Sequence, residues 1–311
     1  MGSEMCIRDR PRRVSWGGPL PPVGHRRGVP PDQRVSGCTE KTLRIYRWWL
    51  RRLVEEVSVS DVVGVRAFFA RLAEKGLSTS TQHQAFRALR AFFRWALDCG
   101  ALPTNPLKGF SMRTPKTLPR VPTPEEVRAV LRACPDTFEG GRNRAMILVL
   151  VDSGVRASEL LHLLAEDWSP ADRSLFVRSG KGRKDRVVFV GATTTRALRA
   201  WLARHPQPAP ESYLFVDRRG RRIKDRHLVT ILHRLSRRAG LPKDRWLHPH
   251  AFRHFAATSW LREGMGLDEV RRLLGHETLA TTLRYSSLVA RDLQQAHRKA
   301  SAVDRLGLDE G

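Results

Sequence analysis

The chain has 311 residues, enough for two domains that each bury a hydrophobic core. Its 56 Lys and Arg residues outnumber its 31 Asp and Glu residues, so the formal net charge is +25 at pH 7. This surplus favours a polyanionic partner such as nucleic acid, although a basic protein from a genome rich in arginine codons would share it. No apolar run is long enough to cross a membrane, and the N-terminus lacks the apolar segment of a secretory signal.

The first 37 residues are rich in Pro, Gly and Arg and have almost no hydrophobic periodicity, which predicts disorder. The opening MGSEMCIRDR differs from the rest and resembles a cloning or assembly artefact; the alternative is a basic arm that touches the DNA backbone. The four cysteines stand far apart without metal-binding spacing, so free thiols in a reducing cytoplasm are expected.

Helical periodicity predicts three helices between residues 38 and 110. The first opens at the N-cap Thr39, the second runs from about Val59 to Glu74, and the third runs from about Thr79 to Leu97. Their paired aromatic residues are read as bundle core rather than as base-stacking platforms. On the third helix Gln82 and Arg87 are candidate DNA contacts, with a solvated basic face as the alternative.

Residues 111–122 are basic and punctuated by prolines, which is typical of an interdomain linker. Thr123 then caps a helix with Pro124 in its first turn. After a loop over 135–141, an apolar helix is expected over 142–153 and ends at Gly154. Arg156 and Glu159 follow, and taken alone they favour a structural ion pair over a catalytic role.

Residues 174–190 alternate in the manner of a β-hairpin, with glycines on both sides of Lys181 at the turn. A lysine at such a tip can reach a groove or give a proton to a leaving oxygen, and the chemistry alone does not choose between Lys181 and Lys184. Further helices are expected over about 193–204 and 228–238, with a short strand over 213–216 between them.

The stretch from Leu247 to Ser286 carries the strongest functional signal. Pro249 and Gly264 bound a predicted helix that places His250 and Arg253 on one face. A second helix runs over 267–274 and ends at Gly275, so that His276 follows a fixed helix end. A third helix opens near Thr278 and carries Tyr285, and a last helix is expected over 288–300.

This combination of side chains favours chemistry at a phosphodiester. The planar guanidinium of Arg253 matches phosphate oxygens, and a tyrosine hydroxyl becomes a nucleophile when its neighbours stabilise the anion. His250 and His276 can transfer protons. A metal site is the alternative for the histidines of this stretch, but no Cys or acidic partner stands at ligand spacing, so no metal is expected; these histidines are His248, His250, His254 and His276.

The pattern His-x-x-Arg, then Leu-Gly-His, then Tyr nine residues later resembles the catalytic domain of the tyrosine recombinase (phage integrase) family. Ser153 to Leu160 resembles the family's first arginine motif, with Ser for Thr and Val for Leu, and the resemblance selects Lys181 as the catalytic lysine. Residues 37–110, from Thr42-Leu43-Arg44-x-Tyr46 to Asn105-Pro106, resemble the family's core-binding domain. The implied catalytic residues are Arg156, Lys181, His250, Arg253, His276 and Tyr285, and Arg183 and Lys184 are further candidate DNA contacts.

The resemblance implies a mainly α fold with a small β-hairpin. Its expected parts are a disordered segment over 1–37, a helical core-binding domain over 38–110, a linker over 111–122 and an α+β catalytic domain over 123–305. It also implies a cytoplasmic, site-specific DNA recombinase that works through a 3'-phosphotyrosyl intermediate, without metal, ATP or another cofactor. The partners would be double-stranded DNA and a homo- or hetero-tetramer assembled on it.

Two other functions stay open at the level of the sequence. One is a catalytically silent DNA-binding protein of the same fold, against which the complete set of six residues argues. The other is an enzyme like the type IB topoisomerases, against which the helical N-terminal domain and the short chain argue. Among recombinases, a Xer-type resolvase, a phage integrase and a mobile-element enzyme are not separated, although the simple two-domain layout leans toward the Xer type.

Overall fold

The structure is a computed structural model that describes residues 40–112, 120–178, 185–207 and 209–289, without the side chains of Arg284 and 286–289. Several predictions lie outside these residues: the segment 1–37, the Thr39 cap, most of the 111–122 linker, 290–300 of the last helix, and Lys181, Arg183 and Lys184. The chain divides into two compact units at Thr117/Leu118, a point within the expected linker. Among the described helices, none is long and apolar enough to cross a membrane.

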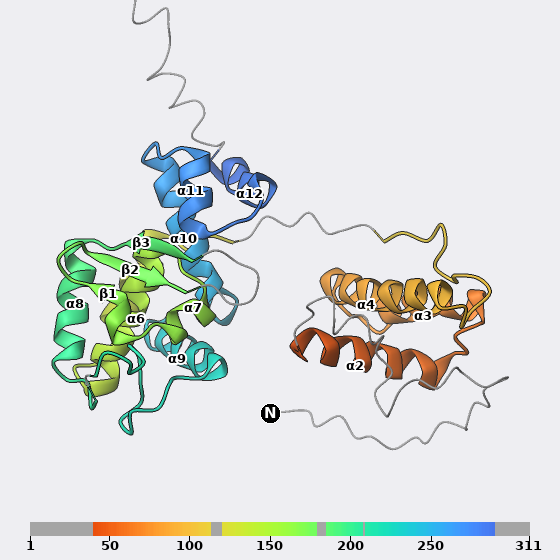
Figure 1. The fold of residues 1–311 in the computed structure, drawn as a ribbon, viewed down its shortest axis with the longest axis horizontal. Coiled ribbons are helices and arrows are strands. Elements are labelled where there is room, and N and C mark those ends of the chain that lie inside the picture. The colour runs from red at the N-terminus through yellow and green to blue at the C-terminus, as the bar shows by residue number, and fades with distance from the viewer. Residues whose placement is uncertain (1–39, 113–119, 179–184, 208, 290–311) are drawn as a thin grey trace, which may run out of the picture. The chain divides into compact units, whose positions relative to one another are not determined.

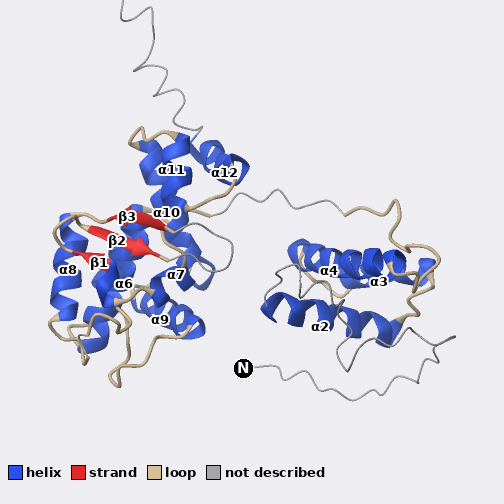
Figure 2. Ribbon diagram, viewed as in Figure 1, coloured by secondary structure: helices blue, strands red, loops and turns tan. Residues whose placement is uncertain are grey.

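Within residues 40–112, the described part of the first unit, there are three helices (Figures 1 and 2): α2 (Glu40–Glu56), α3 (Val62–Glu74) and α4 (Thr79–Asp98). Each turns one apolar face toward a shared core, as the helical spacing predicts. At least one ring of each aromatic pair is buried in this core, while Trp48 is half exposed. The pairs are Trp48/Trp49, Phe68/Phe69 and Phe92/Phe93. The core reading of these pairs is therefore confirmed; the buried rings are Trp49, Phe68, Phe69, Phe86 and Phe93.

Helix α3 begins three residues later than the sequence periodicity indicates. The carboxylate of Asp61 accepts a hydrogen bond from the Gly64 amide at 2.9 Å, so Asp61 is the N-cap. Val59 is buried in the preceding turn rather than in the helix. Hydrophobic periodicity reports that a side chain is buried but does not distinguish a capped turn from the first turn of a helix.

In the second unit helices pack on one face of a small antiparallel sheet (Figure 2), and alternate residues of β2 and β3 are exposed on the other face. Helix α6 packs against α8, α10 and strand β3, and α12 packs against both α10 and α11. The elements in chain order are α5 (Pro124–Arg132), α6 (Phe138–Ser153), α7 (Ala157–His162), β1 (Trp168–Ser169), β2 (Ser174–Val177), β3 (Arg186–Phe189), α8 (Ala192–Leu202), α9 (Asp225–Arg238), α10 (Pro249–Arg262), α11 (Leu267–Leu274) and α12 (Leu279–Val289), with short 3-10 turns at Ala165–Asp167 and Lys243–Arg245.

The strand order is β1-β2-β3, and Leu175 pairs with Val188 in the β2–β3 hairpin. The two strands of the expected hairpin are confirmed. Strand β1 was not predicted, because two residues are too few to show a strand pattern. The expected strand at 213–216 is wrong. Tyr213 and Val216 form only isolated bridges, to Leu164 and Arg222, because no neighbouring strand continues the pairing.

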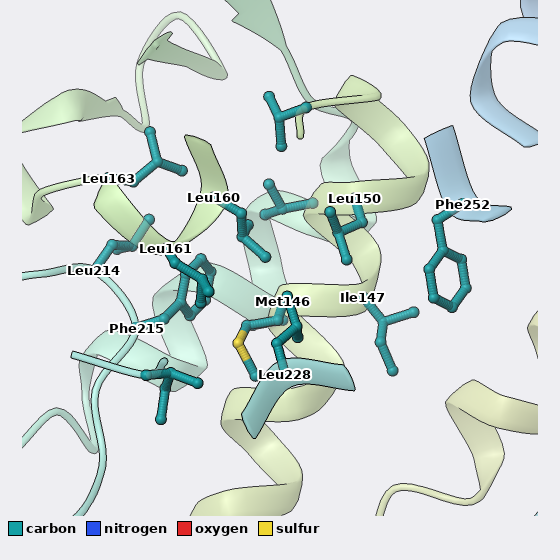
Figure 3. Packing of buried hydrophobic residues seen from close by; sticks show 14 of the residues in the cluster. Met146, Ile147, Leu150, Leu160, Leu161, Leu163, Leu214, Phe215, Leu228 and Phe252 are labelled. Carbon is teal, nitrogen blue, oxygen red and sulfur yellow. The ribbon is translucent and has the colours of Figure 1, made fainter. Parts of the chain in front are cut away.

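Helix α6 is the centre of the hydrophobic core (Figure 3). Met146, Ile147 and Leu150 are fully buried, and Leu160, Phe215 and Phe252 reach them from three other segments. Complete burial of such a side chain contributes about 1.5–3 kcal/mol. The core therefore holds the C-terminal end of α6, and with it the Gly154 turn, in a fixed place.

The start of α6 corrects the prediction of a loop over 135–141. Thr137 accepts a hydrogen bond from the Gly140 amide at 3.1 Å, and the helix begins at Phe138. Gly140 and Gly141 were read as loop residues, because glycine weakens a helix. At Gly140 the reason for glycine is a close approach, since a Cβ there would collide with the Pro135 carbonyl oxygen.

We expect Gly140→Ala to destabilise the protein by about 1–3 kcal/mol, because the added methyl group forces the first turn of α6 away from Pro135. Gly141→Ala is the matched control, since a Cβ there meets only the end of the Arg204 side chain at 3.8 Å. That control should be neutral or stabilising by up to about 1 kcal/mol. Thermal unfolding of both variants checks the expectation, and equal melting temperatures would contradict it.

Candidate active site

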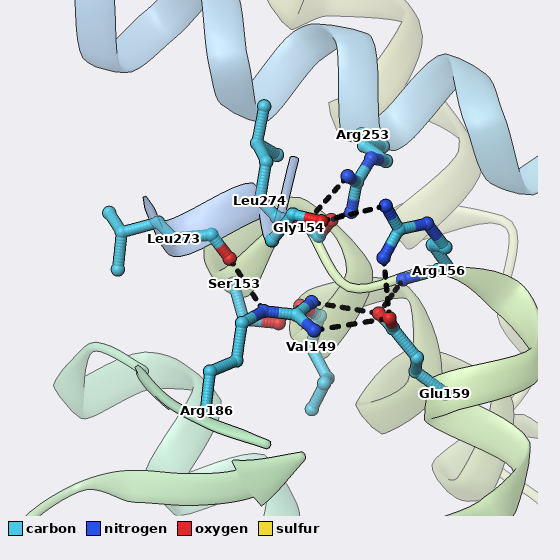
Figure 4. A network of polar contacts seen from close by, with 10 residues as sticks. Val149, Ser153, Gly154, Arg156, Glu159, Arg186, Arg253, Leu273 and Leu274 are labelled. Carbon is cyan, nitrogen blue, oxygen red and sulfur yellow. Dashed lines mark hydrogen bonds and ion pairs between the residues drawn. The ribbon is translucent and has the colours of Figure 1, made fainter. Parts of the chain in front are cut away.

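Two glycine turns and one helix place the arginines of the site. Gly154 ends α6 and Gly275 ends α11, with φ angles of 60° and 64° that suit glycine. Arg253, on α10, donates hydrogen bonds to the carbonyls of Gly154 and Leu274, both at 2.6 Å. Arg156 donates to the Gly275 carbonyl at 3.1 Å. The two guanidinium groups thus meet at the turn after α11, and Arg253 also binds the turn after α6 (Figure 4).

A single carboxylate organises the arginines. Glu159 binds Arg156 at 2.7 Å through the guanidinium and at 2.7 Å through the backbone amide. Its two oxygens also accept from Arg186 at 3.1 and 2.8 Å, and Arg186 Nε donates to the Leu273 carbonyl at 2.9 Å. Figure 4 shows Arg186 reaching from β3 to both α7 and α11. The expected ion pair of Arg156 and Glu159 is present, and it lies within the candidate site. A structural ion pair and a place in the site therefore do not exclude each other.

Sequence reasoning missed Arg186. Its signal was present, because the period of a strand puts Arg186 on the same face of β3 as the buried Val188. An arginine on the core side of a strand needs acceptors for its charged donors, such as a carboxylate. The identity of that partner, Glu159 on α7, depends on tertiary packing that the local pattern does not contain.

The electrostatics follow from burial and from the crowding of cations. Burial lowers the pKa of Arg253 to about 9, Arg156 acts in the same direction, and Glu159 and Tyr285 oppose it. The guanidinium therefore stays charged at neutral pH. Burial, Arg253 and Arg156 lower the pKa of His250, which favours the neutral imidazole. Burial alone would raise the pKa of Glu159, but Arg186 and Arg156 lower it to about 2.

Helix α12 brings Tyr285 to the arginine site. Its ring is only 2% exposed and packs with Ala257, Val270 and Leu274. It lies parallel to the His276 ring, with centroids 6.3 Å apart and an interplanar angle of 5°. His276 Nδ1 is 2.8 Å from the Thr282 hydroxyl, so the loop after α11 is tied to α12.

The Tyr285 hydroxyl lies 3.0 Å from Nδ1 of His254, a residue that sequence reasoning weighed only as a metal ligand. His254 follows Arg253 directly on α10. Within the described parts of the chain, no three His, Cys, Asp or Glu side chains are grouped so that they could hold a metal ion.

Four of the predicted catalytic residues lie close together: Arg156 and Arg253 meet at the turn after α11 (Figure 4), His250 shares α10 with Arg253, and His276 directly follows that turn. The ring of Tyr285 is stacked on that of His276. Lys181, Arg183 and Lys184 lie outside the described residues. Gln82 and Arg87 belong to the first unit. There Gln82 donates to the Leu77 carbonyl at 2.7 Å and Arg87 is exposed, so their DNA contacts stay a prediction.

Comparison with known proteins identifies the family. Residues 120–291 match the phage integrase family, and residues 29–99 match the N-terminal SAM-like domain of phage integrases. The chain is 34% identical over 277 residues to tyrosine recombinase XerA of Thermococcus kodakarensis, covering 88% of this chain and 93% of that protein. It therefore belongs to the phage integrase family and is a site-specific tyrosine recombinase.

Solved structures show the same architecture. The crystal structure of XerA recombinase matches with a TM-score of 0.53 and 26% identity, covering 86% of this chain and 95% of that one. The XerH site-specific recombinase bound to its palindromic difH substrate matches with a TM-score of 0.66 and 24% identity, covering 85% and 78%. The mainly α fold with a small antiparallel sheet is thus confirmed.

Proposed function

We propose that Tyr285 is the nucleophile of a recombination reaction on double-stranded DNA. Its oxygen attacks the scissile phosphorus, a bond to tyrosine forms, and the bond to the 5'-oxygen breaks. The product is a 3'-phosphotyrosyl ester and a free 5'-hydroxyl. A 5'-hydroxyl from a partner strand then reverses the step. The observation that carries this proposal is that Arg156 and Arg253 meet at the turn after α11, the helix on which α12 and Tyr285 pack.

The two guanidinium groups bind the non-bridging phosphate oxygens in this proposal. Their bonds to the carbonyls of Gly154, Leu274 and Gly275 hold each planar fork in one orientation before DNA arrives. Donors aligned in advance stabilise the charge that develops in the transition state more strongly than mobile ones. These cations neutralise the charge that a metal ion neutralises in other phosphoryl-transfer sites.

Proton transfer is assigned to the remaining residues. The burial and nearby arginines that keep His250 neutral suit it to accept a proton from the attacking hydroxyl. Lys181 is proposed to protonate the leaving 5'-oxygen, and His276 to hydrogen-bond to the phosphate. In the reverse step the same groups exchange these roles, so no proton is gained or lost over the cycle.

We further propose that the first unit is the core-binding domain over 38–110 and that the second, over 123–305, is the catalytic domain. A net charge of +25 supports a DNA partner and predicts binding that weakens as salt rises. Strand exchange needs strands from two DNA sites, each cleaved by bound protein. We therefore propose a tetramer assembled on paired sites. The proposed compartment is the cytoplasm, because the four widely spaced cysteines fit free thiols in a reducing environment.

Covalent capture tests the proposed nucleophile. The protein is mixed with nicked fragments of the source genome and denatured, and the attached DNA is sequenced. We expect adducts with the unmodified protein and none with Tyr285→Phe, which keeps the ring but lacks the attacking oxygen. Adducts with both proteins would contradict the assignment. Salt-sensitive binding without any adduct would favour a silent DNA-binding protein, and relaxation of supercoiled plasmid without strand exchange would favour a topoisomerase.

A further inference from the structure

The contact between Tyr285 and His254 has no role in the chemistry described so far. The hydroxyl lies 3.0 Å from His254 Nδ1, and the two ring centroids are 5.5 Å apart with an interplanar angle of 52°. The hydrogen bond therefore joins the proposed attacking oxygen to a side chain of the helix that also carries Arg253. It is made where Tyr285 is 2% exposed, so little water competes for it.

Adjacent residues on α10 serve two different neighbours. Successive side chains on a helix are about 100° apart, so Arg253 and His254 point in different directions. Arg253 reaches the turns after α6 and α11, while His254 reaches α12. The Thr258 hydroxyl donates to the His254 carbonyl at 2.8 Å, one turn further along. Any displacement of α12 relative to α10 therefore changes the distance from the nucleophile to the arginines.

The apolar side chains around Tyr285 contact its ring and do not orient its hydroxyl. Ala257, Val270 and Leu274 contact the ring without offering a polar atom from their side chains. The phenol oxygen must present one lone pair to phosphorus, and attack depends steeply on that alignment. A nitrogen at hydrogen-bond distance supplies this orientation.

We propose that His254 is a positioning residue for the nucleophile, with Nδ1 hydrogen-bonded to the Tyr285 hydroxyl so that the phenol is aligned with the arginine clamp while α12 is packed on α10. This inference rests on the proposed role of Tyr285. In this role the alignment depends on a polar atom at the position of Nδ1 and much less on the packing of the imidazole ring.

Two substitutions separate these features. His254→Asn keeps a polar atom two bonds from Cβ, where Nδ1 stands, and loses the ring. His254→Phe keeps the ring and loses the nitrogen. A positioning role predicts strand cleavage within about 10-fold of the unmodified protein for Asn and a loss of about 100-fold for Phe. A packing role predicts the opposite order. Cleavage is measured as the rate of adduct formation on the duplex recovered by covalent capture.

A spectroscopic arm needs no DNA. The chain has only three tyrosines, so 13Cζ labelling gives three phenol resonances, and Tyr285→Phe assigns the relevant one. We expect the Tyr285 resonance to shift in His254→Phe and to stay near its original position in His254→Asn, with the resonances of Tyr46 and Tyr213 unmoved as internal controls. No shift in His254→Phe, or a shift only in His254→Asn, would overturn the inference.

The two arms also separate this inference from the proposed function. Adducts with Tyr285→Phe would refute the assignment of Tyr285 as the nucleophile. A shift of the Tyr285 resonance in His254→Phe would then report a structural contact without a role in cleavage. A normal cleavage rate in His254→Phe, with no adduct in Tyr285→Phe, would refute only the positioning role.

Discussion

Arg253→Lys is expected to slow DNA strand cleavage by about 100- to 1,000-fold, the cost of removing an aligned donor from a site of developing charge. Arg253 is 3% exposed and uses two nitrogens to bind Gly154 and Leu274 at 2.6 Å. A lysine has one nitrogen and cannot bind both carbonyls and a phosphate oxygen in a planar fork. Charge alone would therefore restore only part of the activity lost in Arg253→Ala.

Adduct formation on the captured duplex measures the effect, and thermal unfolding shows whether the variant is folded. Arg262→Lys is the matched control, because Arg262 lies on the same helix and is exposed. The control should cleave at the normal rate. If Arg253→Lys also cleaved at that rate, the fork geometry would be irrelevant and the proposed clamp would be wrong.

The sequence predicted the helices and the turns of the site well because their signals are local. Thr123 caps α5 as expected, with Glu126 completing a capping box, and α11 has the predicted bounds with Gly275 as its left-handed C-cap. A cap is specified by residues a few positions apart, so the chain carries the information in one short window.

The residues that sequence reasoning missed are those whose role depends on distant partners. Arg186 meets Glu159, 27 residues away, and His254 meets Tyr285, 31 residues away. Neither pair has a spacing that local geometry explains, because the packing of β3 and α7 on α6, and of α12 on α10, brings them together. The same limit applies to the bridges at Tyr213 and Val216, since a short apolar run does not reveal whether a neighbouring strand exists.

Glu159→Gln is expected to lower the free energy of unfolding by about 3–5 kcal/mol, the usual effect of removing one partner of a buried ion pair. The carboxylate is shared by Arg156 and Arg186, whose side chains are 19% and 10% exposed. The amide keeps the size of the side chain but leaves two partly buried guanidinium groups without a counter-charge. Urea unfolding measures the loss. The control Glu166→Gln breaks a pair with Arg178 in which both side chains are about half exposed, so its effect should be under about 1 kcal/mol.

The pH dependence tests the same pair by a different route. Arg186 and Arg156 lower the pKa of Glu159 to about 2 against the desolvation that would raise it, and its ordinary value is 4.5. A carboxylate with a lowered pKa stabilises the fold fully above its ordinary pKa, and that stabilisation is lost as the pH falls toward the folded value. The difference in unfolding free energy between the unmodified protein and Glu159→Gln should therefore be constant near neutral pH and shrink between pH 4.5 and about 2. A difference that stays constant through this range would mean that the charge of Glu159 does not hold the arginines in place.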